Sequence, residues 1–225
     1  TQQVSSAASD VYKRQFALIA KTISSVSGDI SQISEILSAL IFYMGVVILG
    51  LFVHMGITYM TLLKIFTTMD IKHFLKSMAP VQLLGFSTSS SGATLPVTMK
   101  RCEKDLGISE EISSFVLPLG ATINMDGTAL YQGVAAVFIA QAVGMDLTLA
   151  NQFTIVATAV LASIGTAAVP GAGIIMLIII LEAINVPSEG IALILGVDRI
   201  LDMIRTATNV TGDATVASVM DSLER

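Results

Sequence analysis

The longest uncharged stretch of the chain runs from Ile36 to Leu63 and contains no Asp, Glu, Lys or Arg. Because about 20 apolar residues suffice to cross a bilayer as a helix, this pattern predicts a transmembrane helix over residues 36–66. A longer apolar stretch, Ile112 to Leu181, holds only Asp126 and Asp146 as charges. Its Gly, Pro and Asn breaks divide it into several crossings. The pattern predicts an all-α, multi-span membrane protein.

The first 35 residues do not share this pattern. Residues 1–15 are polar, lack the apolar core of a signal peptide and change abruptly at Phe16. We interpret them as disordered or foreign to the natural chain, and we expect the protein to be incomplete at its N-terminal end. Residues 16–35 mix apolar positions with Ser, Gly and Asp. We interpret them as the remnant of a scaffold helix.

Two segments show an apolar, polar, apolar order too short for two full crossings. In residues 71–107 the polar run STSSSG separates the two apolar parts, and basic residues such as Lys72 and Lys104 flank both ends. Residues 149–185 are interrupted by AAVPGAG and flanked by acids only. Since Lys and Arg mark the cytoplasmic side, the segments are predicted to be re-entrant hairpins that enter from opposite faces.

Each predicted hairpin is followed by a longer helix. Residues 109–145 form a helix broken at the motif NMDGT, and residues 188–223 form an amphipathic helix. The repeated order of hairpin and helix is the inverted-repeat layout that transporters use around a site at the membrane midplane.

Composition excludes other classes of protein. Hydrophobic residues make up 53% of the chain and charged residues 13%, about half the share usual in soluble domains. The formal net charge of -5 leaves no basic surface for nucleic acid. The single cysteine, Cys102, supports neither a disulfide framework nor a thiolate metal cluster. We expect a multi-pass protein of the cell membrane, with the lipid bilayer as its partner.

The last predicted helix carries a polar stripe. Its members are spaced four, three, four and four residues apart and cover an arc of about 80°; they are Asp198, Asp202, Arg205, Asn209 and Asp213. Charges in lipid are costly, so the stripe must face the interior. One interpretation is an ion pair between Asp202 and Arg205 that only neutralises both charges. The other is a site in which Asp202 receives a ligand ammonium, Arg205 a carboxylate and Asp213 a cation.

The tips of the two predicted hairpins, STSSSG and AAVPGAG, and the NMDGT motif are further candidate binding elements. NMDGT places an amide, a carboxylate and a hydroxyl beside a Gly that lets the helix unwind, so freed carbonyls can bind sodium. An ordinary turn is the alternative. The tips offer N–H groups at helix starts for an α-carboxylate and can act as gates, or they are flexible linkers. We interpret His54 as a packed residue and assign it no role.

These motifs resemble the dicarboxylate/amino acid:cation symporter family, which includes bacterial glutamate/aspartate symporters and excitatory amino acid transporters. The similarity covers residues 16–223 and is densest in SSSGATLPVTM, LPLGATINMDGTALYQG, ASIGTAAVPGAG and DMIRTATNVTGD. It implies the transport core of a glutamate-transporter-like fold, an elevator mechanism and a homotrimer for a full chain about twice as long. It implies no cofactor, with sodium ions as co-transported ligands.

The resemblance also implies site residues. The substrate would contact Ser90, Ser91, Thr128, Val169, Gly173, Asp202, Arg205, Thr206 and Asn209. Sodium would bind in three sets: Gly120, Asn124, Asn209 and Asp213; Thr122, Ser163, Ile164 and Thr166; and Asn124 with Asp126.

Within this resemblance, Arg205 favours glutamate or aspartate, because members specific for neutral amino acids lack that arginine and C4-dicarboxylate carriers have a different motif there. Animal members carry a glutamate, linked to proton co-transport, at the position of Gln132. Some archaeal members carry an arginine at the position of Ser89. The choices between glutamate and aspartate, and between sodium and protons, stay open here.

Two alternatives of other classes are an intramembrane serine hydrolase, with a nucleophile in residues 87–91, and an anion channel. The hydrolase needs a general base. The chain has two histidines, and neither His54 nor His73 is evidently paired with the serine run. We therefore expect a carrier and not an enzyme.

Overall fold

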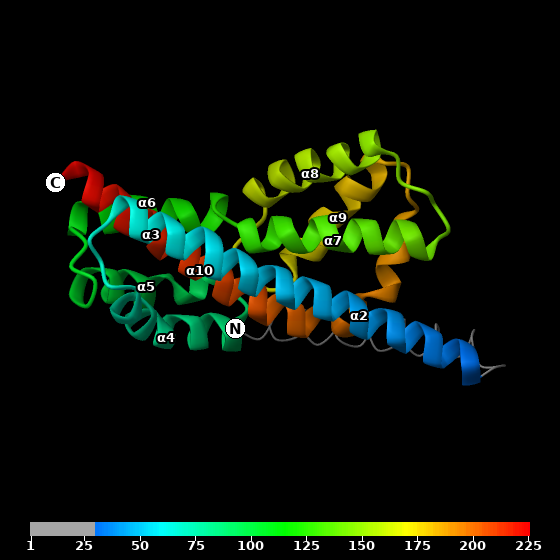
Figure 1. Cartoon of the computed structure of the whole chain (residues 1–225), viewed down its shortest axis with the longest axis horizontal. Helices are drawn as coiled ribbons and strands as arrows, with labels where there is room; N and C mark the ends of the chain where they lie inside the picture. The colour runs from blue at the N-terminus through cyan, green and yellow to red at the C-terminus, as the bar shows by residue number, and fades with distance from the viewer. Residues whose placement is uncertain (1–29) are drawn as a thin grey trace, which may run out of the picture.

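The computed structural model of the chain describes residues 30–225. The prediction for residues 1–15 and most of the helix remnant predicted over residues 16–35 therefore lie outside the described residues. Within residues 30–225 the chain is all-helical and contains no strand (Figure 1). This agrees with the all-α class expected from the apolar pattern.

The first described element is a long rod. It consists of α2 (Ile30–His54), the π-helical turn η1 (Met55–Tyr59) and α3 (Met60–Phe66). Within it, Ser34–Phe66 is 33 residues long and is the one helical stretch of the described chain long and apolar enough to cross a membrane. Residues such as Ile41 and Phe42 are exposed along it.

Helices α4 (Ile71–Thr88) and α5 (Ser91–Lys104) follow and pack against each other. The Asp70 side chain caps α4 by accepting a hydrogen bond from the His73 backbone. Ser89 ends α4 in a left-handed conformation with φ of 52°, and Ser90 caps the start of α5. The serine run therefore stops one helix and starts the next within two residues.

Helices α6 (Glu110–Ile123) and α7 (Asp126–Ala142) are separated by a break at Asn124 and Met125, whose backbones leave the helical region. Ser109 caps α6 through a hydrogen bond from Ile112 N–H. The break falls within NMDGT.

Helix α8 (Leu149–Ile164) begins at its cap Thr148, and α9 (Ala172–Ala183) begins after Gly171, whose φ of 76° suits glycine. The two helices are apolar and shorter than a full crossing. A 3-10 helix, η2 (Ser188–Leu193), leads into α10 (Leu195–Glu224).

Helix α10 is the axis of the fold. Figure 1 shows α4, α5 and α6 gathered around its C-terminal end and α7, α8 and α9 around its N-terminal end, with α2 alongside. Each end has its own hydrophobic core, with Leu201 in one core and Val210 and Ala214 in the other. The polar residues of α10 between Asp202 and Asn209 lie where these two cores meet.

Candidate functional site

The polar stripe of α10 lies inside the protein. Its residues Asp198, Asp202, Arg205, Asn209 and Asp213 are each at most 5% exposed. Their burial follows from the packing of α10 between the two hydrophobic cores. Five buried polar side chains on one helix face need partners, and the surrounding elements supply most of them.

Arg205 is held by its own helix and by one aromatic ring. Its Nε atom donates to Asp202 Oδ1 at 3.0 Å, and its Nη1 atom donates to Asp198 Oδ1 at 3.3 Å. The guanidinium carbon lies 4.1 Å from the centre of the Tyr131 ring. The Asp202–Arg205 ion pair of the simpler interpretation is therefore present, with Asp198 as a second acid.

Among the described residues, one nitrogen of this guanidinium contacts an acid without forming a hydrogen bond. Nη2 of Arg205 lies 2.8 Å from Asp202 Oδ1, but it is buried and makes no hydrogen bond within the described chain. A guanidinium has five N–H donors, and a buried donor without an acceptor is costly. Arg205 therefore retains donor capacity for a further carboxylate.

The first tip, where α4 ends and α5 begins, and the second tip, between α8 and α9, meet over the polar stripe of α10. The Ser90 hydroxyl donates to the Ala168 carbonyl at 2.7 Å, and Gly92 N–H donates to the same carbonyl at 3.3 Å. Gly171 N–H donates to Asp202 Oδ2 at 2.9 Å. The second tip thus contacts both the first tip and the acid that pairs with Arg205.

A cavity of about 20 Å³ lies between the tips and α10. Every predicted substrate residue except Ser90 lines it, together with residues of the two tips and the break; the full lining is Ser89, Ser91, Met125, Thr128, Thr166, Ala167, Ala168, Val169, Gly173, Asp202, Arg205, Thr206 and Asn209. Space of this size holds about one water.

Gly173 is required where α9 begins beside this cavity. A Cβ atom at this position would lie 2.9 Å from Arg205 Nη2 and 3.1 Å from Thr128 Cγ2. Any larger residue would therefore displace the guanidinium or Thr128.

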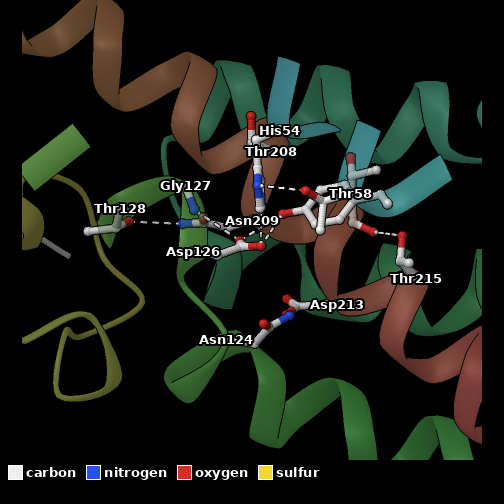
Figure 2. A network of polar contacts seen from close by, with 12 residues as sticks. His54, Thr58, Asn124, Asp126, Gly127, Thr128, Thr208, Asn209, Asp213 and Thr215 are labelled. Carbon is white, nitrogen blue, oxygen red and sulfur yellow. Dashed lines mark hydrogen bonds and ion pairs between the residues drawn. The ribbon is translucent and has the colours of Figure 1, made fainter. Parts of the chain in front are cut away.

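The first predicted cation set lies around the break between α6 and α7, as Figure 2 shows for Asn124, Asn209 and Asp213. Asn124 Nδ2 donates to Asp213 Oδ1 at 3.1 Å. A Cβ atom on Gly120 would lie 2.7 Å from that same oxygen, so the glycine permits the close approach of Asp213. The four residues of this set therefore lie close together around the break.

Asn209 links the break to the cavity. Its Oδ1 atom accepts a hydrogen bond from Gly127 N–H at 2.9 Å, and its Nδ2 atom donates to Thr128 Oγ1 at 3.0 Å. Asn209 also lines the cavity. One residue of the predicted substrate set therefore contacts both the break and the cavity.

Asp126, the acid of NMDGT, is turned toward the rod of α2 and η1. It accepts hydrogen bonds from the Tyr59 hydroxyl and from Gly127 N–H, and its Oδ2 atom lies 2.7 Å from His54 Nε2. Its predicted cation partner Asn124 instead bonds to Asp213. His54, to which the sequence assigned no role, is therefore a direct neighbour of a predicted site residue.

The second predicted cation set is not joined by hydrogen bonds in the described part of the chain. Thr122 is exposed and bonds back to Leu119 in its own helix, and Ser163 and Thr166 bond to Val160 and Ala162. The Ile164 side chain is 47% exposed. Helices α6 and α8, which carry Thr122, Ser163 and Ile164, are in contact, and Thr166 follows the end of α8.

Three further residues belong to the site by contact. Asp198 and Tyr131 hold Arg205, and Gln132 Nε2 donates to the Gly173 carbonyl at 2.9 Å. Asp198 was part of the predicted stripe without a binding role. The NMDGTALYQG motif contains Tyr131 and Gln132, but only the three-dimensional packing shows which residues they contact.

The comparisons with known proteins all indicate the same family. Residues 15–223 match the family model described as the sodium:dicarboxylate symporter family. The chain is 44% identical over 202 residues to excitatory amino acid transporter 3 of Mus musculus and 41% identical over 192 residues to an excitatory amino acid transporter of Caenorhabditis elegans. It is 43% identical over 183 residues to excitatory amino acid transporter 2 of Homo sapiens.

These alignments cover most of this chain and a smaller share of each relative. The mouse alignment covers 89% of this chain and 39% of the relative, and the human alignment covers 81% and 32%. The chain therefore spans about a third to two fifths of the length of the curated relatives it matches.

Proposed function

Because the chain belongs to the sodium:dicarboxylate symporter family, we propose that it forms the substrate-binding part of a sodium-coupled symporter of acidic amino acids, L-glutamate or L-aspartate. The observation that carries this proposal is the buried guanidinium of Arg205, which has an unused donor beside a cavity shared by two tips. A fixed guanidinium binds a carboxylate in a forked geometry that a neutral side chain cannot match.

Each part of the substrate has a candidate partner. The side-chain carboxylate would bind Arg205, and the ammonium would bind Asp202. The α-carboxylate would bind N–H groups and hydroxyls at the tips, such as Ser91 and Gly173, where helices begin. Thr128, Thr206 and Asn209 would complete the contacts, and Val169 would close the site through its backbone.

Entry of the substrate requires the second tip to open. The cavity is far smaller than an amino acid, and Gly171 N–H already occupies one Asp202 oxygen. The ammonium would replace Gly171 as the partner of Asp202, and the substrate carboxylate would relax the Arg205–Asp202 pair. We propose that α8 and α9 form a re-entrant hairpin that acts as this gate, and that α4 and α5 form its inverted counterpart.

Sodium would bind at the break and beneath the second tip. Oxygen ligands suit this ion, and Asp213 with Asn124, Asn209 and Gly120 offers carboxylate, amide and carbonyl oxygens in one place. Thr122, Ser163, Ile164 and Thr166 would form a second site when the tip closes over substrate. Asp126 would take part in a third. The full-length protein would act as a homotrimer in the cell membrane.

The structure of the serine run argues against the hydrolase. The Ser90 hydroxyl donates to the Ala168 carbonyl. His54 contacts Asp126, and His73 contacts the Asp105 carbonyl. Within the described chain, no histidine contacts the serine run. A fluorophosphonate probe should therefore leave Ser90 and Ser91 unlabelled, and labelling of either would support the enzyme.

The decisive experiment is uptake by the protein at its natural length, reconstituted into proteoliposomes. Labelled aspartate and glutamate should enter only with an inward sodium gradient, and Arg205→Ala should abolish entry. Arg199→Ala, which removes an arginine of α10 outside the stripe, is the matched control and should transport normally. Uptake without sodium, or normal uptake by Arg205→Ala, would contradict the proposal.

The same vesicles separate related functions. Preference for succinate would indicate a C4-dicarboxylate carrier, preference for alanine or serine a neutral amino acid carrier, and a sodium-independent anion current without substrate a channel. The presence of Arg205 favours the acidic amino acids over the other substrates.

A further inference from the structure

The π-helical turn η1 places two polar residues of the rod on one face. His54 precedes η1 and Tyr59 ends it, five residues later. In an α-helix, residues five apart are rotated by about 140° and point in different directions. The wider π turn is closed by i→i+5 hydrogen bonds and brings residues five apart closer to one face, and such turns are frequent at functional sites. Both side chains consequently reach Asp126, and Figure 2 shows His54 beside this carboxylate.

Tyr59 makes the closest contacts with this carboxylate. Its hydroxyl lies 2.7 Å from Asp126 Oδ1 and 2.6 Å from Oδ2, and His54 Nε2 lies 2.7 Å from Oδ2. The His54 and Tyr59 rings meet edge to face at 4.9 Å, and the Thr58 hydroxyl lies 3.2 Å from His54 Nδ1. The carboxylate is therefore fixed in position and in rotation.

Tyr59 also reaches the opposite side of the break. It is 3% exposed, and a Cβ atom on Gly212 would lie 2.6 Å from its hydroxyl oxygen and 3.4 Å from Asn124 Nδ2. Gly212 thus lets the phenol lie against α10, directly beside Asp213. The hydroxyl is placed between the acid of NMDGT and the segment of α10 that carries the other acid.

We infer that Tyr59, placed by the π turn, is a positioning residue that sets the Asp126 carboxylate for the cation at the break. This inference rests on the proposed sodium coupling. Groups that hydrogen-bond to a metal ligand orient it, and their loss typically weakens metal binding by about 10–100-fold. Tyr59 need not touch the cation or the substrate to have this effect.

The test is the sodium dependence of amino acid binding in the natural-length protein. Tyr59→Phe removes the hydroxyl and keeps the ring. It should raise the sodium concentration for half-maximal L-aspartate or L-glutamate binding by about tenfold. Amino acid affinity at saturating sodium should stay within about twofold, because the cavity residues are unchanged.

Tyr43→Phe is the matched control, because Tyr43 is a buried tyrosine of the same rod whose hydroxyl has no partner among the described residues. It should leave the sodium dependence unchanged. An unchanged sodium dependence in Tyr59→Phe, or an equal change in both variants, would overturn the inference. A wild-type protein that binds the amino acid without sodium would instead refute the proposed function.

A double-variant comparison tests whether Tyr59 acts through Asp126. Tyr59→Phe should add no further loss of sodium affinity to Asp126→Asn, whereas an additive loss would overturn the positioning role. If Tyr59→Phe does not fold, His54→Ala removes the other donor to the same carboxylate. It should then raise the half-saturating sodium concentration in the same direction, and no change would count against the inference.

Discussion

The Ser90 hydroxyl donates a hydrogen bond of 2.7 Å to the Ala168 carbonyl, 78 residues away, and accepts one of 3.1 Å from Ala93 N–H. One side chain thus caps α5 and joins the two tips. This contact holds the two tips together, so in the proposed gating it would oppose the opening of the second tip.

Replacing Ser90 with Ala should loosen the second tip. The loss of one cap and one tip contact should lower the free energy of unfolding by about 1–2 kcal/mol. Backbone hydrogen exchange of residues 166–171 should speed up more than that of α10. Ser87→Ala, which removes a hydroxyl bonded only within α4, is the control. Equal exchange in both variants would show that Ser90 does not hold the tip.

Variants of Arg205 can distinguish its contribution to folding stability from its contribution to ligand binding. Arg205→Gln leaves the buried acids Asp198 and Asp202 without their cation, which should cost about 3–5 kcal/mol of unfolding free energy. Adding Asp198→Asn removes one of these acids and should restore part of the loss. Neither variant should bind an acidic amino acid, because the carboxylate partner is gone.

Thermal unfolding and a binding titration check this pair of variants. Recovery of glutamate or aspartate binding in the double variant would show that Arg205 serves only as a counter-ion to the acids. Recovery of stability without binding would assign the guanidinium to the ligand.

The all-α class and the polar face of α10 could be predicted from the amino acid pattern, and the reason is local. Spacings of three and four residues place Asp202, Arg205 and Asn209 on one face of any helix, and charges in an apolar chain must point inward. The burial of that face in the structure follows from the same rule. The break at NMDGT was likewise predictable from residues that favour turns.

Contacts between distant residues could not be predicted in this way. No periodicity indicates that Ser90 meets Ala168, or that the Tyr131 ring packs on Arg205. The sequence of the rod from α2 to α3 predicts one continuous apolar helix, because its apolar pattern does not distinguish a π turn from an α turn. For this reason His54 and Tyr59 were not recognised as neighbours of Asp126.

Gly127 permits the close approach of α7 and α10. A Cβ atom here would lie 2.7 Å from Asn209 Oδ1 and 3.1 Å from the Arg205 carbonyl. Gly127→Ala should therefore cost about 1–3 kcal/mol of unfolding free energy and displace Asn209, which weakens amino acid binding.

Gly133 is the matched control on the same helix. A Cβ atom at this position meets nothing within 4 Å, so Gly133→Ala should stabilise the helix by up to about 1 kcal/mol. Denaturation and binding measured on both variants test the contact. Equal stability of the two variants would contradict the close approach at Gly127.

Gln132 supplies the last prediction, because it is buried and donates through Nε2 to the Gly173 carbonyl while its Oε1 has no partner among the described residues. In Gln132→Glu, only a protonated carboxyl can donate this hydrogen bond. Amino acid binding should therefore weaken as pH rises and recover as pH falls, while the parent protein changes little. Gln141→Glu, on an exposed position of α7, is the control. A pH-independent Gln132→Glu would show that the Gly173 contact does not influence the site.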